Sequence, residues 1–223
     1  MNNLEEFIKD YTSRSRHHTK LIDFIYPELN KIKYSNILEF GVSNQAMSTE
    51  LFLEHAKLSH CKLFSVDNID YRNKFIDPNW KFIHCRDDDF SYVKSKIPNK
   101  FNLILLDTIH EAKHVEKIIY AYYDFLEVNH CFFIDDISWL PYLKNSDKNR
   151  FYAEVNNYET FNKILEIYFN NQKNIKIEFN FQGTGMCKIK KINNLKLNKT
   201  RKIVTRFNSI KNILRVIFRN RWY

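Results

Sequence analysis

The sequence predicts an α/β fold with a doubly wound, mostly parallel sheet, and two observations predict it. Five short apolar runs alternate with stretches of helical periodicity between residues 36 and 134. Uninterrupted apolar runs of this length are typical of parallel strands that helices cover on both faces. Two further runs, joined through Gly183-Thr184-Gly185, are typical of an antiparallel hairpin whose turn uses the freedom of glycine. We therefore expect a seven-stranded sheet with a reversed edge.

The elements are expected in the following order. Helical periodicity predicts two opening helices, over 4–10 and 19–29, and a short polar connection follows them. The apolar runs predict parallel strands at 36–40, 62–66, 81–84, 101–106 and 130–134, with helices over 46–56 and 111–126. A helix over 159–169 precedes the hairpin strands, at 175–181 and 186–189. The chain thus divides into N-terminal helices that pack on the core (residues 1–35), the sheet domain (residues 36–192) and a basic amphipathic C-terminal helix (residues 193–223).

Composition places the chain among single-domain soluble proteins. It has 223 residues, of which 44% are hydrophobic and 27% charged, enough for one buried core. No stretch approaches the roughly 20 apolar residues that a membrane-spanning helix needs, and the first ten residues do not resemble a secretory signal. The four cysteines are isolated in the sequence, which favours buried thiols over disulfides or a zinc site. We therefore expect a cytoplasmic protein.

The net charge of +9 is concentrated at the C-terminus. Residues 191–223 contain ten Lys or Arg residues and no Asp or Glu, whereas the other residues contain 25 bases and 26 acids. From Ile203 onward, apolar residues recur at spacings of four and three, as on one face of a helix. We expect this basic helix to bind an anionic membrane surface, at the inner side of the membrane. Nucleic-acid contact, packing on the body of the protein and packing on a second copy in a homo-oligomer are the alternatives.

Polar residues follow every predicted parallel strand, and most of them are acidic. The residues at or after these strand ends, with Gly41 included for its place after the first strand and Glu39 for its place near the end of that strand, are Glu39, Gly41, Asp67, Arg86, Asp87, Asp88, Asp89, Asp107, His110, Asp135 and Asp136. The carboxyl ends of parallel strands meet at one edge of a sheet, and ligands bind there, at the switch point of strand order. We therefore expect a ligand site lined by these side chains.

The residue types at this edge suit definite tasks. Asp67 can accept hydrogen bonds from both hydroxyls of a ribose, and Gly41 permits the backbone to approach a ligand closely. Three neighbouring carboxylates, those of Asp107, Asp135 and Asp136, cannot all stay ionised without compensation, which a Mg²⁺ ion would supply.

Two of these positions have a plainer alternative. His110 can accept a proton near neutral pH, or it is a helix-start histidine without a role. The acids at 87–89 bind a ligand, or they cap the next helix. His114, one helical turn after His110, is expected at the surface.

Three stretches of the sequence resemble class I S-adenosylmethionine-dependent methyltransferases. ILEFGVSNQAMST resembles their first motif, SVDN resembles their ribose-binding motif, and residues 101–138 resemble the strand–helix–strand region of their small-molecule branch. Within this superfamily the likeness is to metal-dependent O-methyltransferases of the catechol and macrocin types. The resemblance implies a Rossmann-like fold and S-adenosylmethionine as the cofactor.

The resemblance also implies a role for each residue at the strand ends. The positions that match cofactor contacts are Glu39, Gly41, Asp67, Asp87 and Asp107, where Asp87 stands for a stretch, 86–88, that is expected beside the adenine. The positions that match Mg²⁺ ligands are Asp107, Asp135 and Asp136. His110 stands where the family carries its proton acceptor.

The chain departs from the family at several glycines. Gln45 stands near the usual second glycine of the cofactor loop, Thr108 follows the acid of strand four, and Asn129-His130 replaces a Gly-Gly pair. Asn and Ser tolerate unusual backbone angles, so such turns can persist without glycine. The departures also leave open a methyltransferase-like module without activity. The Pro-Pro-aromatic motif of amino-group nucleic-acid methylases is absent after strand four, which disfavours base N-methylation.

The sequence as a whole predicts an S-adenosylmethionine-dependent, Mg²⁺-assisted O-methyltransferase that acts on a hydroxyl of a sugar, glycan or other small molecule. Residues 137–159 form either a lid over that acceptor or a packed surface loop. The aromatic and basic residues of this segment are Trp139, Tyr142, Arg150, Phe151 and Tyr152. A glycan made at the inner membrane surface would be within reach of an enzyme whose tail docks there. An RNA methyltransferase that holds RNA with its tail and a non-catalytic membrane adaptor are the alternatives.

Overall fold

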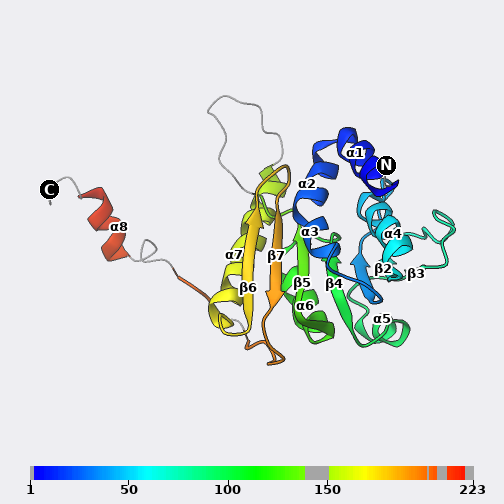
Figure 1. Ribbon diagram of the computed structural model, residues 1–223. Helices are drawn as coiled ribbons and strands as arrows, with labels where there is room; N and C mark the ends of the chain where they lie inside the picture. Colours follow the sequence, from blue (N-terminus) through cyan, green and yellow to red (C-terminus); the bar gives the residue numbers. More distant parts are fainter. Residues whose placement is uncertain (1–2, 139–150, 200, 205–209, 219–223) are drawn as a thin grey trace.

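The structure is a computed structural model that describes residues 3–138, 151–199, 201–204 and 210–218. Its centre is one seven-stranded sheet in the order β3-β2-β1-β4-β5-β7-β6, which confirms the predicted doubly wound arrangement (Figure 1). The strands are β1 (Asn36–Phe40), β2 (Lys62–Asp67), β3 (Trp80–His84), β4 (Phe101–Leu106), β5 (Leu126–Asp135), β6 (Ile175–Asn180) and β7 (Met186–Lys191). The helices are α1 (Asn3–Arg14), α2 (Arg16–Phe24), α3 (Tyr26–Leu29), α4 (Met47–Ser59), α5 (Phe90–Lys96), α6 (Ala112–Tyr122), the short η1 (Tyr123–Phe125), α7 (Phe151–Asn170) and α8 (Ile210–Ile217).

Strands β1 to β5 are parallel, and β7 runs antiparallel between β5 and β6. From β1 the chain first moves outward to β2 and β3, and then crosses back to add β4 on the other side of β1. The strand order therefore reverses between β1 and β4, and the loops that follow these two strands diverge at the carboxyl edge of the sheet.

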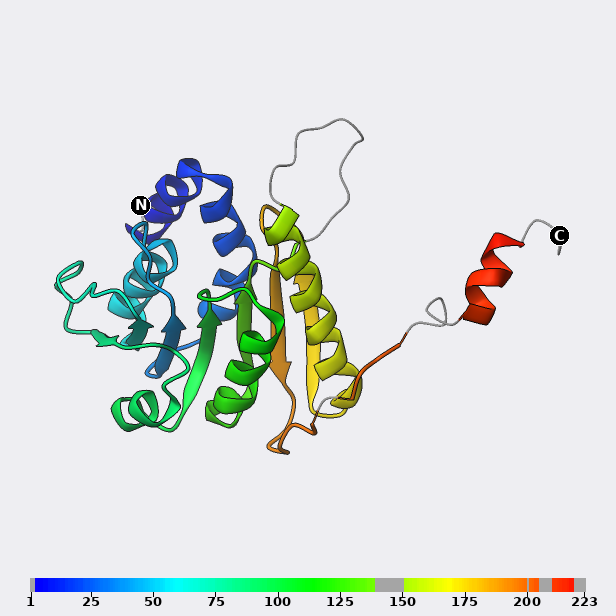
Figure 2. The same cartoon turned by 180° about the vertical axis from the view of Figure 1, so that it is seen from behind.

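The core consists of two apolar clusters, one on each face of the sheet. Successive side chains of a strand point to opposite faces, so Leu38 and Phe40 join one cluster while Ile37 joins the other. Helices α5, α6 and α7 cover the first face, and α1, α2 and α4 cover the second (Figures 1 and 2). Burial on both faces explains why the parallel strands are continuous apolar runs in the sequence.

The N-terminal helices pack on the second face of the sheet. Two opening helices were expected, and the structure has three, because the expected second helix divides at Ile25 into α2 and α3, with Pro27 in the first turn of α3. Ser15 separates α1 from α2 and caps α2 by accepting a hydrogen bond from the N–H of His18 (3.4 Å). Tyr11 of α1 is completely buried, and its hydroxyl donates to the carbonyl of Met47 (2.6 Å). These contacts fix the start of α2 and hold α1 against the start of α4.

The C-terminal segment is not the single helix that the sequence predicts. Residues 193–199 and 201–204 are not helical, and α8 is the helix found in the described part of this segment. The side-chain amides of Asn170, Asn171 and Asn174 donate to backbone carbonyls at residues 201, 198 and 196 (3.0–3.3 Å). These bonds fasten the segment to the end of α7 in a non-helical conformation, and the prediction of a helix that includes Ile203 is wrong.

Candidate functional site

A cavity of about 400 Å³ opens at the carboxyl edge of the sheet, at the switch point between β1 and β4. Four residues that the sequence predicts as cofactor contacts line it: Gly41, Asp67, Asp87 and Asp107. Apolar side chains of Val66, Ile69 and Ile109 and the ring of Tyr71 complete much of its wall. Doubly wound sheets bind nucleotide-like ligands in a crevice at this position.

Gly41 allows three strand ends to meet at the floor of the cavity. Its φ is +95°, and a Cβ on this residue would lie 1.9 Å from the carbonyl oxygen of Asp107. Its N–H donates to the carbonyl of Val66 at the end of β2 (2.9 Å). No side chain fits here, since the loop after β1 passes directly over the end of β4.

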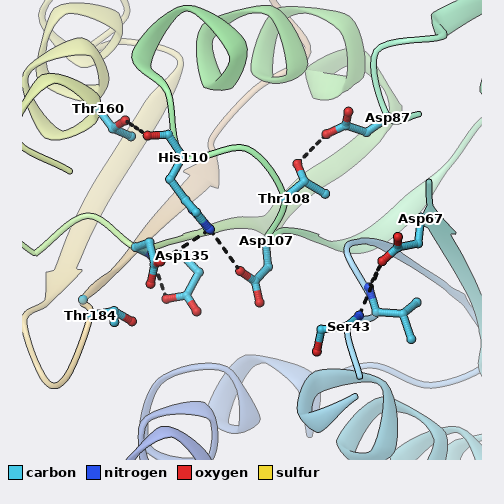
Figure 3. Close-up of polar contacts among 12 residues, drawn as sticks. Ser43, Asp67, Asp87, Asp107, Thr108, His110, Asp135, Thr160 and Thr184 are labelled. Carbon is cyan, nitrogen blue, oxygen red and sulfur yellow. Dashed lines mark hydrogen bonds and ion pairs between the residues drawn. The ribbon is translucent and has the colours of Figure 1, made fainter. Parts of the chain in front are cut away.

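The carboxylate of Asp67 organises the loop that follows β1. Its Oδ2 accepts hydrogen bonds from the N–H groups of Val42 (2.8 Å) and Ser43 (3.4 Å), and its Oδ1 accepts one from Ile69 (2.8 Å) (Figure 3). A carboxylate can accept about four hydrogen bonds, so the group keeps acceptor capacity toward the cavity that it lines. The structure thus places the predicted ribose acid in the cavity wall.

Asp87 connects the end of β3 to β4 and α6. Its buried carboxylate accepts a hydrogen bond from the hydroxyl of Thr108 and is hydrogen-bonded to Nε2 of His114 at 2.7 Å. The expectation of a surface histidine at 114 is wrong, because this side chain is buried against Asp87. Asp89, in contrast, caps α5 by accepting from the N–H of Tyr92 (3.3 Å), as the plainer alternative for this stretch predicts.

Glu39 is not part of the cavity. The side chain is completely buried, and its carboxylate accepts hydrogen bonds from the hydroxyls of Ser48 (2.6 Å), Thr49 (2.9 Å) and Ser65 (2.6 Å). Burial raises the pKa of Glu39 to about 7, and the three hydroxyl bonds oppose this rise. Glu39 ties β1 to the start of α4 and to β2, so the structure does not bring this predicted cofactor contact into the cavity.

His110 lies between the ends of β4 and β5. Its Nε2 is 3.7 Å from Oδ1 of Asp107 and 3.4 Å from Oδ2 of Asp136 (Figure 3). The hydroxyl of Thr160, on α7, donates to the backbone carbonyl of His110 (3.5 Å). The imidazole is 29% exposed, so a proton on it can exchange with solvent or with a bound molecule. The structure therefore brings His110 together with two of the three predicted acids.

The third acid, Asp135, is paired with a lysine that sequence reasoning missed. Lys20, on α2, is buried and forms an ion pair with the carboxylate of Asp135. The described residues contain no group of three His, Cys, Asp or Glu side chains placed to hold a metal ion. The predicted Mg²⁺ ligands, Asp107, Asp135 and Asp136, therefore do not fit the ion in the arrangement that the structure gives them.

The electrostatics of this group raise the pKa of two of its carboxyls, those of Asp107 and Asp135. Burial, together with the carboxylates of Asp135 and Asp136, raises the pKa of Asp107 well above its ordinary value. Burial also raises the pKa of Asp135, against the opposing effect of the Lys20 ammonium. A carboxyl with a raised pKa beside an imidazole is an arrangement suited to holding and passing a proton.

The methyltransferases that the sequence resembles carry glycines at positions in two turns where this chain has none. In both turns, non-glycine residues of this chain take left-handed backbone angles. Ser43 and Ala46, on either side of Gln45 in the loop after β1, have φ of +60° and +47°, and Asn129 has φ of +68°. Each such non-glycine residue costs about 1 kcal/mol of backbone strain. The loop after β1 thus has only one glycine, Gly41, and takes its other left-handed angles at non-glycine residues, at a cost in stability.

The predicted lid lies mostly outside the described residues, which end at residue 138 and resume at 151. Trp139, Tyr142 and Arg150 are among those left out, whereas α7 already begins at Phe151 rather than at residue 159. Tyr152, at the start of that helix, is 82% exposed. Among the helices of the described residues, none has the length and apolar character needed to cross a membrane.

No family model matches the sequence, and no curated protein matches it. Solved methyltransferase structures do match. The SAH-bound methyltransferase PaMTH1 of Podospora anserina has a TM-score of 0.61 at 13% identity, over 86% of this chain and 89% of that one. The MycE methyltransferase of the mycinamycin biosynthetic pathway, in complex with Mg and SAH, has a TM-score of 0.60 at 13% identity, over 84% of this chain. This chain covers 55% of MycE, about half of its length.

A further match is a Clostridium thermocellum protein assigned as an rRNA methylase, with a TM-score of 0.51 at 12% identity, over 76% of this chain and 96% of that one. These likenesses establish the fold. They do not show which reaction this chain catalyses.

Proposed function

We propose that this chain, which has the class I methyltransferase fold, is an S-adenosylmethionine-dependent O-methyltransferase that acts on a hydroxyl of a sugar, glycan or other small molecule. The proposal rests on one observation, which is that the same residue lines the cavity and lies beside His110. Asp107 lines the cavity and also faces Nε2 of His110 at 3.7 Å. A ligand-sized crevice and a proton acceptor therefore adjoin at the switch point of the sheet.

The cavity residues fit S-adenosylmethionine. Asp67 keeps acceptor capacity for ribose hydroxyls, and the apolar walls formed by Ile69 and Ile109 suit the faces of an adenine ring. Asp87 and Arg86 also line the cavity, and Gly41, which has no side chain, lets a ligand contact the backbone there. When bound, this cofactor supplies an electrophilic methyl group on a sulfonium.

The reaction that these residues support is deprotonation of an acceptor hydroxyl as the methyl group is transferred. His110 takes the proton on Nε2 and becomes positively charged. Asp107 and Asp136, at 3.7 and 3.4 Å from that nitrogen, stabilise the charged imidazole. Thr160 holds the backbone of His110 in place. The histidine therefore acts as the base and the two acids orient and stabilise it.

The proposed reaction does not use a metal ion. The MycE complex contains Mg, and the sequence of this chain predicts the same ion, but Asp135 is already paired with Lys20 here. A MycE structure that also contains mycinamycin VI supports a small-molecule acceptor for the fold. The rRNA methylase likeness supports the alternative of RNA, which acceptor assays distinguish.

Replacing Asp67 by alanine is expected to weaken S-adenosylmethionine binding at least about tenfold, because one charged hydrogen-bonding group is worth about 1.5–3 kcal/mol. Calorimetric titration of the cofactor into the purified protein measures this change. The matched control is Asp70→Ala, which removes a carboxylate of the same loop that pairs with Arg72 (2.9 Å) and does not line the cavity. No binding to the wild-type protein at millimolar cofactor would contradict the proposed function and favour the adaptor.

We also propose that the basic C-terminal segment docks on an anionic membrane surface. The apolar residues of α8 form one stripe, and Ile210, Ile213, Leu214 and Ile217 are between 39% and 79% exposed. Lys211 and Arg215 are exposed beside this stripe. With ten bases and no acid in residues 191–223, the segment combines an uncovered apolar face with charge complementary to anionic lipids.

Leu214→Asp is expected to lower binding to phosphatidylglycerol-rich vesicles at least about tenfold, since it buries a charge in the apolar stripe. Vesicle co-sedimentation measures the effect, with neutral phosphatidylcholine vesicles as the reference. Leu58→Asp, at a leucine of α4 that is 53% exposed, is the matched control and should bind as the wild type does. Vesicle binding that Leu214→Asp leaves unchanged, or salt-sensitive RNA binding without vesicle binding, contradicts the membrane proposal.

A further inference from the structure

Lys20 is the one lysine of the described residues that reaches the acidic group at the ends of β4 and β5. It comes from α2, is 1% exposed, and its ammonium contacts three oxygens. These are the carboxylate of Asp135, the hydroxyl of Thr184 (3.0 Å) and the carbonyl of Gly185 (3.5 Å). An ammonium has three protons to donate, and this one has three acceptors.

A buried ammonium with this set of partners has a defined electrostatic role. Taking a charge out of water costs several kcal/mol unless it is paired and hydrogen-bonded. Lys20 meets both conditions, through Asp135 and through the hairpin turn that contains Thr184 and Gly185. Figure 3 shows Thr184 beside Asp135, at the edge of the group that contains His110 and Asp107. The lysine therefore places one fixed positive charge among three carboxylates.

A divalent cation at the same place would meet two obstacles. The Oδ1 atom of Asp135, which would be a ligand, already accepts from Lys20 and from the N–H of Asp136 (2.9 Å). A metal ion bound to this carboxylate would also stand close to the ammonium, and the two like charges would repel each other. Removal of the lysine removes the repulsion and one of the two hydrogen bonds to this oxygen, and leaves the bond from Asp136.

We propose that the ammonium of Lys20 takes the place of a divalent cation in this group, so that the protein binds no metal ion at Asp107, Asp135 and Asp136. Lys20 is then a positioning residue. It holds the carboxylate of Asp135, which also accepts from the N–H of Asp136, the residue whose side chain faces His110. The inference about metal binding depends only on the contacts of Lys20 and Asp135. The inference about His110 rests in addition on the proposed function.

The test uses Mn²⁺ as the probe, followed by electron paramagnetic resonance on the purified full chain. Wild type is expected to show no site with a dissociation constant below about 1 mM, whereas Lys20→Met frees Asp135 and should bind Mn²⁺ at least about tenfold more tightly. The double variant Lys20→Met/Asp135→Asn should lose that gain. Lys57→Met, at a lysine that is 55% exposed and pairs with Glu54, is the matched control and should behave as wild type.

Two outcomes would overturn the inference. One is Mn²⁺ binding to wild type that Asp135→Asn abolishes, which decides the question even if Lys20→Met does not fold. The other is a folded Lys20→Met variant that gains no Mn²⁺ binding and whose thermal midpoint Mn²⁺ does not raise. Neither readout involves S-adenosylmethionine, so the result is independent of whether the protein transfers methyl groups.

Discussion

Gly41→Ala is expected to destabilise the protein by about 3 kcal/mol or more and to abolish S-adenosylmethionine binding. The backbone angle alone accounts for about 1–2 kcal/mol, since φ is +95° and alanine is strained there. The larger part comes from the Cβ, which would lie 1.9 Å from the carbonyl oxygen of Asp107. This oxygen belongs to the backbone at the end of β4, so the strand end itself must shift. Denaturant unfolding and cofactor titration measure the two effects.

The matched control is Gly183→Ala, in the hairpin turn. Gly183 also has a positive φ, +59°, but the nearest atom to an added Cβ is 3.8 Å away, on His17. This variant should lose about 1 kcal/mol, from backbone strain alone. Equal losses in the two variants would show that the contact between Gly41 and Asp107 does not determine the stability of the site.

His110→Ala is expected to lower the rate of methyl transfer by about 10²–10⁴-fold and to leave S-adenosylmethionine affinity unchanged within about twofold. The imidazole reaches the cavity only through Asp107, so its loss removes the base without removing a cofactor contact. The rate is measured as S-adenosylhomocysteine release, with the best acceptor from a panel of free sugars, nucleotide sugars and catechols.

The control is His130→Ala, which removes a histidine of β5 that pairs with Asn102 (2.7 Å), at the far end of β4 from the cavity. It should keep the wild-type rate. Loss of cofactor binding in His110→Ala, or an unchanged rate, would contradict the role of His110 as the base.

The strands and the location of the site can be predicted from the sequence because both depend on local pattern. The run FNLILL at 101–106 matches β4 residue for residue, since a strand buried on both faces is apolar over most of its length, here at every position except Asn102. The place of Gly41 follows from the same logic, because a chain that leaves one strand end and crosses another needs a residue without a Cβ.

The partners of the acids cannot be predicted in this way. Lys20 and Asp135 are 115 residues apart, and His114 and Asp87 are 27 apart. Nothing in the local pattern around Lys20, which lies in an amphipathic helix, separates it from a solvated lysine. Three acids that seem unpaired in the sequence therefore predict a metal ion, whereas the packing of α2 on the sheet supplies a lysine. The sequence also fails to predict the role of Glu39. Only the fold shows that the hydroxyls of Ser48, Thr49 and Ser65 surround its carboxylate.

The direction of β7 determines the edge of the sheet from which the C-terminal segment leaves. At one end of the hairpin, Met186 pairs with Asp135 beside the cavity edge, and at the other end Lys191 pairs with Ile175. The C-terminal segment leaves from this second end, where asparagines at the end of α7 fasten it, at the lower edge in Figure 2. The C-terminal segment therefore leaves the sheet at the edge opposite the carboxyl ends of β1 and β4, where the cavity opens.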